Sequence, residues 1–291
     1  MALCALSDDA LGVICEGLRS VLDPRVVVGF SSASRELWAL TQALLQQLRA
    51  DYEAVAALCV KVGLRGCKEL REAKQFNFPN QGLSGADLAL LGTLGSVLTA
   101  LEQLYLVEPT GTVCPDGVQR LAEGLGAGAL PAATMFIASG MHVGDVGASA
   151  LAAALGRGAL PRLMSGLGLC DAGIGDAGMV VLAPALRRQS ALVGLILTNN
   201  PFGDEGLNAL VAPPLPAGAL PPPIGGLKEL TVLNLDRTQV SDAGCATLAS
   251  ALDSGALPAL DKLNLNDIPA SAAAKKAVHA ALARSRAAFP S

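Results

Sequence analysis

Four aspartates recur at the same place in a repeating pattern and could together hold a divalent cation. Asp145, Asp176, Asp204 and Asp242 each follow a glycine or serine and precede a segment with the apolar spacing of a helix. Carboxylate oxygens are ligands for Mg²⁺ and Ca²⁺, but an acid at the start of a helix also accepts hydrogen bonds from unpaired amides. Because all four begin a predicted helix, we interpret them as structural caps rather than a metal site.

The other reactive side chains do not form a catalytic arrangement in the sequence. His142 lies in a predicted turn and His279 in the last predicted helix, so the two belong to different repeats. Neither lies beside a cysteine or aspartate at a spacing typical of nucleophilic catalysis. Gly166 and Gly168 lie inside a predicted strand, which is the wrong place for a phosphate-binding loop. We therefore predict no enzymatic activity, no cofactor and no metal.

The number and spacing of the cysteines indicate the cellular compartment of the protein. Seven cysteines occur singly, and no two form a Cys-x-x-Cys pair. An odd, scattered set indicates reduced thiols in an intracellular protein rather than a disulfide framework or a zinc site. Segment 1–12 carries acids where a signal peptide needs basic residues. These features predict a cytoplasmic or nuclear protein.

Composition limits the partner classes. The net charge of −4 argues against nucleic acid as the main partner, and every long apolar run is interrupted, which argues against a membrane span. Hydrophobic residues make up 52% and charged residues 16%, so the chain is expected to fold. Aromatic residues make up only 3%, and there are 32 glycines. The core must then consist of Leu, Ala and Val, with close backbone packing at glycines.

The segment from Ala191 to Leu210 holds one complete structural unit. Leu195 and Leu197 predict the inward positions of a short strand, a turn follows, and Gly203-Asp204 opens a helix. A strand and a helix of this size cannot cover their own apolar faces. The same unit recurs along the chain, which predicts a solenoid.

About seven such units align on two markers that stay in phase. The Gly-Ala-Leu-Pro sequence at 128–131, 158–161, 218–221 and 255–258 precedes a strand each time. Its glycine ends a helix and its proline prevents the helix from continuing. The other marker is the pair of inward strand residues: Phe76 and Phe78, Leu104 and Leu106, Phe136 and Ala138, Leu167 and Leu169, Leu195 and Leu197, Leu233 and Leu235, and Leu263 and Leu265.

Residues 67–291 resemble leucine-rich repeats of the ribonuclease-inhibitor type, on segments such as LVGLILTNNPFGDEGLNAL and LTVLNLDRTQVSDAGCATLASAL. The resemblance implies an α/β solenoid of horseshoe form, with parallel strands on the concave face and helices on the convex face. That family usually carries an asparagine three residues after the second strand anchor, and here only Asn200 holds that place. We expect the other turns to satisfy their backbone amides with different partners.

Residues 1–66 do not follow the repeat and predict a small α-helical unit. Helices are expected over about 7–21, 34–48 and 51–62, where apolar residues keep helical spacing. Because the open end of a solenoid must be covered, this unit could be a plain cap over the first repeat.

The same segment resembles an F-box over residues 6–40. The matching residues are Leu6-Ser7-Asp8-Asp9, Leu22-Asp23-Pro24-Arg25 and Ser34-Arg35-Glu36-Leu37-Trp38. F-box segments bind an adaptor subunit of cullin-based ubiquitin ligases. The resemblance implies that the adaptor-binding residues are Leu11, Ile14, Leu18 and Trp38.

Strand residues that alternate with the inward anchors are predicted to line the concave face. The middle of this face is apolar or bare, and its C-terminal end is polar. A contiguous apolar band on a protein surface indicates a partner site, unless the aliphatic residues merely reflect strand composition. The predicted partner-binding residues are Gln103, Tyr105, Met135, Ile137, Ile196, Val232, Asn234, Asp236 and Asn264.

Segment 213–223 contains six prolines and predicts a projecting loop, which is either a tolerated insertion or an extended recognition element. The sequence as a whole predicts a protein–protein interaction module that binds a partner protein on its concave face. The F-box resemblance implies a ubiquitin-ligase substrate receptor. The alternatives are a Ran-type GTPase-activating protein, whose family shares the repeat type, and a scaffold in a larger assembly.

Overall fold

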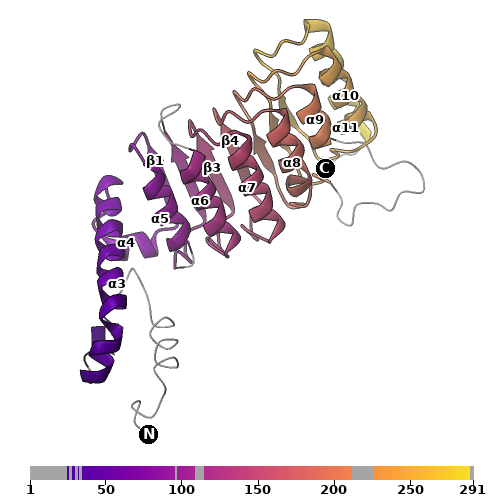
Figure 1. Ribbon diagram of the computed structural model, residues 1–291. Helices are drawn as coiled ribbons and strands as arrows, with labels where there is room; N and C mark the ends of the chain where they lie inside the picture. Colours follow the sequence, from indigo (N-terminus) through magenta and orange to yellow (C-terminus); the bar gives the residue numbers. More distant parts are fainter. Residues whose placement is uncertain are drawn as a thin grey trace. The chain divides into compact units, whose positions relative to one another are not determined.

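A computed structural model describes residues 35–95, 97–108, 115–211 and 226–288, together with Arg25, Val28, Gly29 and Ser32 (Figure 1). The described residues belong to two compact units, one that ends at Ala73 and one that starts at Lys74. Each unit is described by itself below.

The first unit contains a long helix and a short one, α3 (Arg35–Lys61) and α4 (Cys67–Glu72). We expected two helices with a break near Asp51, and this prediction is wrong because α3 continues through that position. No glycine or proline interrupts the sequence there, and the Gln47 side-chain amide donates to the Asp51 carboxylate 2.7 Å away on the next turn. The buried side chains of α3 include Leu48 and Leu58.

The second unit alternates strands and helices over its whole described length (Figure 1). Its elements are β1 (Gln75–Pro79), α5 (Gly85–Leu94), β2 (Gln103–Val107), α6 (Pro115–Gly126), β3 (Met135–Ser139), α7 (Gly144–Gly156), β4 (Gly166–Cys170), α8 (Asp176–Arg187), β5 (Gly194–Ile196), α9 (Asp204–Val211), β6 (Val232–Asn234), α10 (Asp242–Asp253), β7 (Lys262–Asn264) and α11 (Ala272–Ala288).

The strands form one parallel sheet in which each strand pairs with the next one in sequence. The first and last strands are not paired to each other, so the sheet is open. The helices lie on one side of the sheet, each packed against the helix of the neighbouring coil (Figure 1). This confirms the predicted α/β solenoid. The face of the sheet opposite the helices is called the strand face below.

The core lies between the sheet and the helices, where the strand anchors point. Every predicted anchor whose side chain is described is buried, from Phe76 in β1 to Leu265 after β7. The register places anchors of neighbouring coils side by side, as with Leu167 and Leu195. Each coil therefore completes the apolar core of its neighbours.

The helix-ending glycines behave as predicted. Gly128, Gly158 and Gly255 follow α6, α7 and α10 with φ values of 94°, 89° and 75°, a left-handed conformation in which a Cβ atom is strained. The fourth Gly-Ala-Leu-Pro sequence, at 218–221, lies outside the described residues, as does the proline-rich segment 213–223.

The turns after the strands use several different side chains, as expected from the missing asparagines. Asn200 is buried, donates to the Leu169 carbonyl of the preceding coil at 2.6 Å and accepts from the Ile174 amide at 3.0 Å. Glu108 is also buried, and its carboxylate accepts from the amides of Gly82 and Leu83 at 2.9 and 3.0 Å. In the first turn, a glutamate carboxylate thus accepts the hydrogen bonds of the backbone amides that an asparagine side chain accepts in the turn of Asn200.

The four repeating aspartates link successive coils. Asp145 accepts from the Gly175 amide at 2.7 Å, and Asp242 accepts from the Ser271 amide at 2.5 Å. Asp204 accepts from the amides of Ser241 and Gly244 at 2.8 and 3.0 Å. The hydrogen-bond partners of these carboxylates are the amides that begin the helix of the next coil. This differs from the prediction, in which each aspartate capped the helix that it begins.

The aspartates leave no room for a side chain on the glycines in the first turn of the next helix, Gly178, Gly206 and Gly244. A Cβ atom on Gly244 would lie 2.3 Å from Asp204 Oδ1, and one on Gly178 would lie 2.5 Å from Asp145 Oδ1. A carboxylate in one coil thus requires a glycine in the next. Such close approach is the packing that the glycine-rich composition predicted.

Leu195→Ala and Ile196→Ala test the strand register. Leu195 is fully buried, so we expect its truncation to lower the free energy of unfolding by about 2–5 kcal/mol. Ile196 is partly exposed on the strand face, and its truncation should cost less than about 1 kcal/mol. Urea denaturation measures both. Equal losses would contradict the register.

Gly244→Ala tests the steric demand of the link. The new methyl group would displace the Asp204 carboxylate, so we expect a loss of about 1–3 kcal/mol in the free energy of unfolding. The matched control is Gly156→Ala in α7, where the nearest atom to a Cβ is Arg188 Nη1 at 3.8 Å. The control should be neutral or slightly stabilising by thermal denaturation. A tolerated alanine at 244 would show that the contact is not tight.

Candidate protein-binding surface

The strand face carries the residues predicted to bind a partner. The register aligns Gln103 with Met135, and it aligns Tyr105 with Ile137. Further along the same face, Ile196 pairs with Asn234 and Asn234 pairs with Asn264. Val232 begins β6 and Asp236 lies two residues after its end. Asn264 is exposed, and the other eight side chains are partly exposed. The structure thus places all nine on one face, and their role as partner contacts stays a prediction.

The apolar middle of this face is a packed cluster. The Tyr105 hydroxyl donates to the Met135 sulfur at 2.8 Å, which joins β2 to β3. Ile137 lies over β4, because a Cβ atom on Gly168 would fall 2.5 Å from Ile137 Cδ1. The sequence indicated bare glycines here, but the larger side chains of β3 cover Gly168. The middle of the strand face is therefore apolar and has a fixed shape.

Two exposed residues beside this cluster were missed by the sequence reasoning. Met164 is 48% exposed and Val193 is 39% exposed. Met164 lies two residues before β4 and Val193 lies directly before β5. The Val193 amide donates to the Met164 carbonyl at 2.8 Å. Before β2, β3, β6 and β7 two successive amides donate to one carbonyl of the preceding coil, whereas the amides of Met164, Ser165 and Gly166 all donate to the Thr134 carbonyl. The chain thus has one extra residue before β4, in the manner of a bulge. The sequence does contain a signal for this exposure. The strand anchor Leu167 comes four residues after Leu163, whereas Leu195 comes three residues after Leu192.

We call the apolar region of the strand face the central patch. Exposed or partly exposed apolar side chains from five neighbouring coils contribute to it. It is made up of Tyr105, Met135, Ile137, Met164, Val193, Ile196 and Val232.

The C-terminal end of the strand face is polar, and part of its polarity serves the backbone. Asn234 Oδ1 accepts from the Asp236 amide at 2.9 Å, and Asp236 Oδ1 accepts from the Asn266 amide at 2.6 Å. Arg237 and Asp267 form an exposed ion pair at 3.4 Å. These bonds fix the polar side chains in place beside the central patch.

The terminal helix α11 uses its arginines to contact the coils before it. Arg284 donates two hydrogen bonds to Asp253, at 3.0 and 2.8 Å, and Arg286 pairs with Asp261 at 2.9 Å. The bond from Arg284 lowers the pKa of the Asp253 carboxyl.

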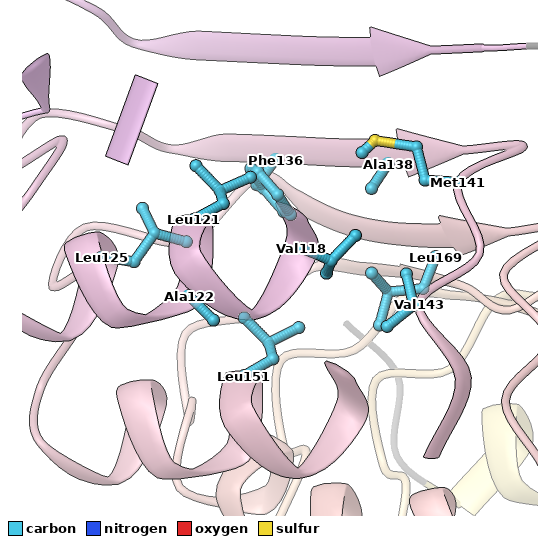
Figure 2. A pocket seen from close by; sticks show the side chains of 10 residues that line it. All are labelled: Val118, Leu121, Ala122, Leu125, Phe136, Ala138, Met141, Val143, Leu151 and Leu169. Atoms are coloured by element: carbon cyan, nitrogen blue, oxygen red, sulfur yellow. The ribbon is translucent and has the colours of Figure 1, made fainter. Parts of the chain in front are cut away.

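A small cavity lies beneath Ala138, between β3, α6 and α7 (Figure 2). Ala138 occupies a strand anchor where later coils have leucine, which leaves space beside Leu121, Leu151 and Leu169. The cavity measures about 10 Å³ and its lining is apolar. A space of this size holds about one water molecule, so it is a packing defect and not a ligand site.

Reactive groups are few on this surface. Within the described residues, no group of three His, Cys, Asp or Glu side chains is placed to hold a metal ion. Burial raises the pKa of the Cys170 thiol beside the strand face, and Asp171 adds to this effect. In the same part of the chain, no helix has both the length and the hydrophobicity to cross a bilayer.

The predicted adaptor-binding residues are described only in part. Leu11, Ile14 and Leu18 lie outside the described residues. Trp38 lies in α3, but the position of its side chain is not described. Their contact with a ligase adaptor stays a prediction.

Comparison with protein families gives a match to one coil of the second unit. A family model described as a leucine-rich repeat matches residues 192–211, the coil formed by β5 and α9. This coil is similar to a leucine-rich repeat. The other described coils share its strand register and its helix on the same side of the sheet, so the second unit has the fold of a leucine-rich-repeat solenoid. The ribonuclease-inhibitor type and the F-box stay predictions.

A solved structure of the leiomodin-1 actin-binding site 2 also matches. The two chains are 15% identical, with a TM-score of 0.42, and the match covers 60% of this chain and 90% of that one. The search of curated proteins finds no match.

Proposed function

We propose that this leucine-rich-repeat solenoid is a binding module that holds a partner protein on its strand face, with the central patch as the main contact. Solenoids of this kind offer extended surfaces of aligned strands to their partners. The observation that carries the proposal is the exposure of Met164 and Val193 beside the cluster of Tyr105, Met135 and Ile137. Exposed apolar side chains that gather on one face favour a protein partner.

The packing of the patch favours binding because little order has to be created. Ile137 rests on Gly168, and the Tyr105 hydroxyl is bonded to Met135, so these side chains hold their positions before a partner arrives. A surface that is already ordered loses less side-chain entropy on association. Met164 and Met135 add adaptable thioether side chains that fit partners of different shape.

The polar end of the strand face provides direction. Asn264 is exposed, and Asn234 and Asp236 lie in the neighbouring coil with partial exposure. We expect the partner to place apolar side chains over the central patch and hydrogen-bonding groups over these residues. Such an arrangement of apolar centre and polar rim is typical of protein interfaces.

Met164→Asp tests the binding surface, with Val181→Asp as its control. Both side chains are 48% exposed, but Val181 lies on α8, on the opposite side of the sheet from the strand face. A charge placed in the central patch should weaken binding tenfold or more, because the partner would bury it without a counter-charge. Quantitative mass spectrometry of proteins retained from native extract, followed by titration of the purified partner, measures the effect.

The two variants must be compared at equal stability, which thermal denaturation checks. The proposal expects a partner that is lost with Met164→Asp and retained with Val181→Asp. Loss of the partner with Val181→Asp alone would place the contact on the helices and contradict the proposal.

The more specific roles stay predictions. A ligase receptor would co-purify with the cullin adaptor through the N-terminal unit, and the absence of that association would end this role. A Ran-type activator would raise the rate of GTP hydrolysis when added to the GTPase. A scaffold would migrate with other subunits in native extract.

A further inference from the structure

Exposed arginines gather at the edge of the second unit where α6, α7 and α8 end. Arg157 directly follows α7, and Arg188 directly follows α8. Because each helix follows a strand of a parallel sheet, neighbouring helices run in the same direction and their C-terminal ends share one edge of the solenoid (Figure 1). Arg162 lies on the same edge, in the connection from α7 to β4. We call Arg157, Arg162 and Arg188 the arginine edge.

Two of these arginines lie against the helix of the preceding coil. A Cβ atom on Gly126, the last residue of α6, would fall 2.9 Å from Arg157 Cζ. A Cβ atom on Gly156, the last residue of α7, would lie 3.8 Å from Arg188 Nη1. The same pairing of arginine and glycine thus occurs in successive coils. It places the Arg157 guanidinium in close contact with α6 before any ligand is bound.

The connections at this edge carry positive charge and no negative charge. Segments 127–134, 157–165 and 188–193 join α6 to β3, α7 to β4 and α8 to β5, and they contain no aspartate or glutamate. Within the part of the chain that the structure describes, no ion pair joins any residue of the arginine edge to a carboxylate. The nearby Glu123 on α6 accepts from the Gln119 side chain instead. The three exposed guanidinium groups are therefore available to a ligand.

The structural uses of arginine at helix ends do not account for all of these residues. Arg187, the last residue of α8, is half-buried and donates to the Ala209 carbonyl of α9, so its charge serves the link between two coils. The helix dipole stabilises a cation within the last turn of a helix, which suits Arg157 and Arg188. Arg162 lies six residues beyond the end of α7, outside the reach of the dipole.

The arginine edge adjoins the central patch. Arg162 is two residues before Met164, and Arg188 is five residues before Val193. An extended peptide spans about 3.3 Å per residue. A partner that covers Met164 and Val193 therefore reaches the arginines with the next few residues of its chain.

We propose that the arginine edge binds an acidic segment of the partner protein, next to the part of the partner that covers the central patch. This inference rests on the proposed function, because it gives the same partner a second contact. A guanidinium group binds a carboxylate with two parallel hydrogen bonds. The whole chain has a net charge of −4, so most of its surface repels an acidic segment and this edge attracts one. The same net charge disfavours nucleic acid as the ligand.

Titration of a fluorescein-labelled decaglutamate peptide with the full-length protein tests the arginine edge without the partner. Fluorescence anisotropy at low salt follows the binding. Arg157→Gln/Arg188→Gln should raise the Kd about tenfold or more, because charge-assisted hydrogen bonds to two guanidinium groups are lost. The matched control is Lys262→Gln/Lys276→Gln, which removes the same charge from exposed lysines of β7 and α11. The control should change the Kd less than about twofold.

The titration can contradict the proposal in three ways, once thermal denaturation has shown that both variants are folded. The wild type could fail to bind the peptide, or the lysine variant could lose as much affinity as the arginine variant. Tighter binding of a labelled oligouridine of equal charge, dependent on Arg157 and Arg188, would place a nucleic acid on this edge. Each of these results would overturn the proposal.

The partner itself separates this inference from the proposed function. We expect Arg157→Gln/Arg188→Gln to weaken binding of the partner about tenfold, and added salt to weaken the wild type more than this variant. A partner that is lost with Met164→Asp but bound equally by the arginine variant would overturn the arginine edge alone. A partner that Met164→Asp retains in full would contradict the proposed function itself.

Discussion

The spacing of the coils is set by an aspartate at the start of each helix. Its carboxylate accepts hydrogen bonds from backbone amides at the start of the helix in the next coil. Asp176 accepts from the amides of Gly203 and Gly206, and Asp204 accepts from those of Ser241 and Gly244. The amides at a helix start have no partner within their own helix, so the preceding coil provides one. Because the carboxylate lies where a Cβ atom of the glycine would be, both residue types are needed at once.

The core and the strand face both follow from this spacing. Each coil is too small to bury its own apolar residues, so the leucines that point inward are covered only where the next coil lies at contact distance. The remaining strand residues are then held in parallel register on the opposite face. Ile137 can cover Gly168 because the two are paired across β3 and β4. The proposed binding surface is thus shaped by the same repeat that builds the core.

Most of the repeat could be predicted from the sequence, because leucine spacing and helix-ending glycines act locally. The role of Asp204 as a cap was predicted, but its partner was not, because the sequence does not show which helix start lies nearest. The continuity of α3 was missed, since Asp51 is typical of a helix start and also tolerated inside a helix. Met164 was missed because strict alternation along a strand does not account for an extra residue at its beginning.

Hydrogen exchange in Asp204→Ala, followed amide by amide by NMR, tests the link between coils most directly. Asp204 is 37 residues before Ser241 and 40 before Gly244 in sequence. The account predicts that the amides of Ser241 and Gly244 lose protection while those in the first turn of α9 keep theirs. Loss of protection within α9, with Ser241 and Gly244 unchanged, would show that the carboxylate serves its own helix and would contradict the account.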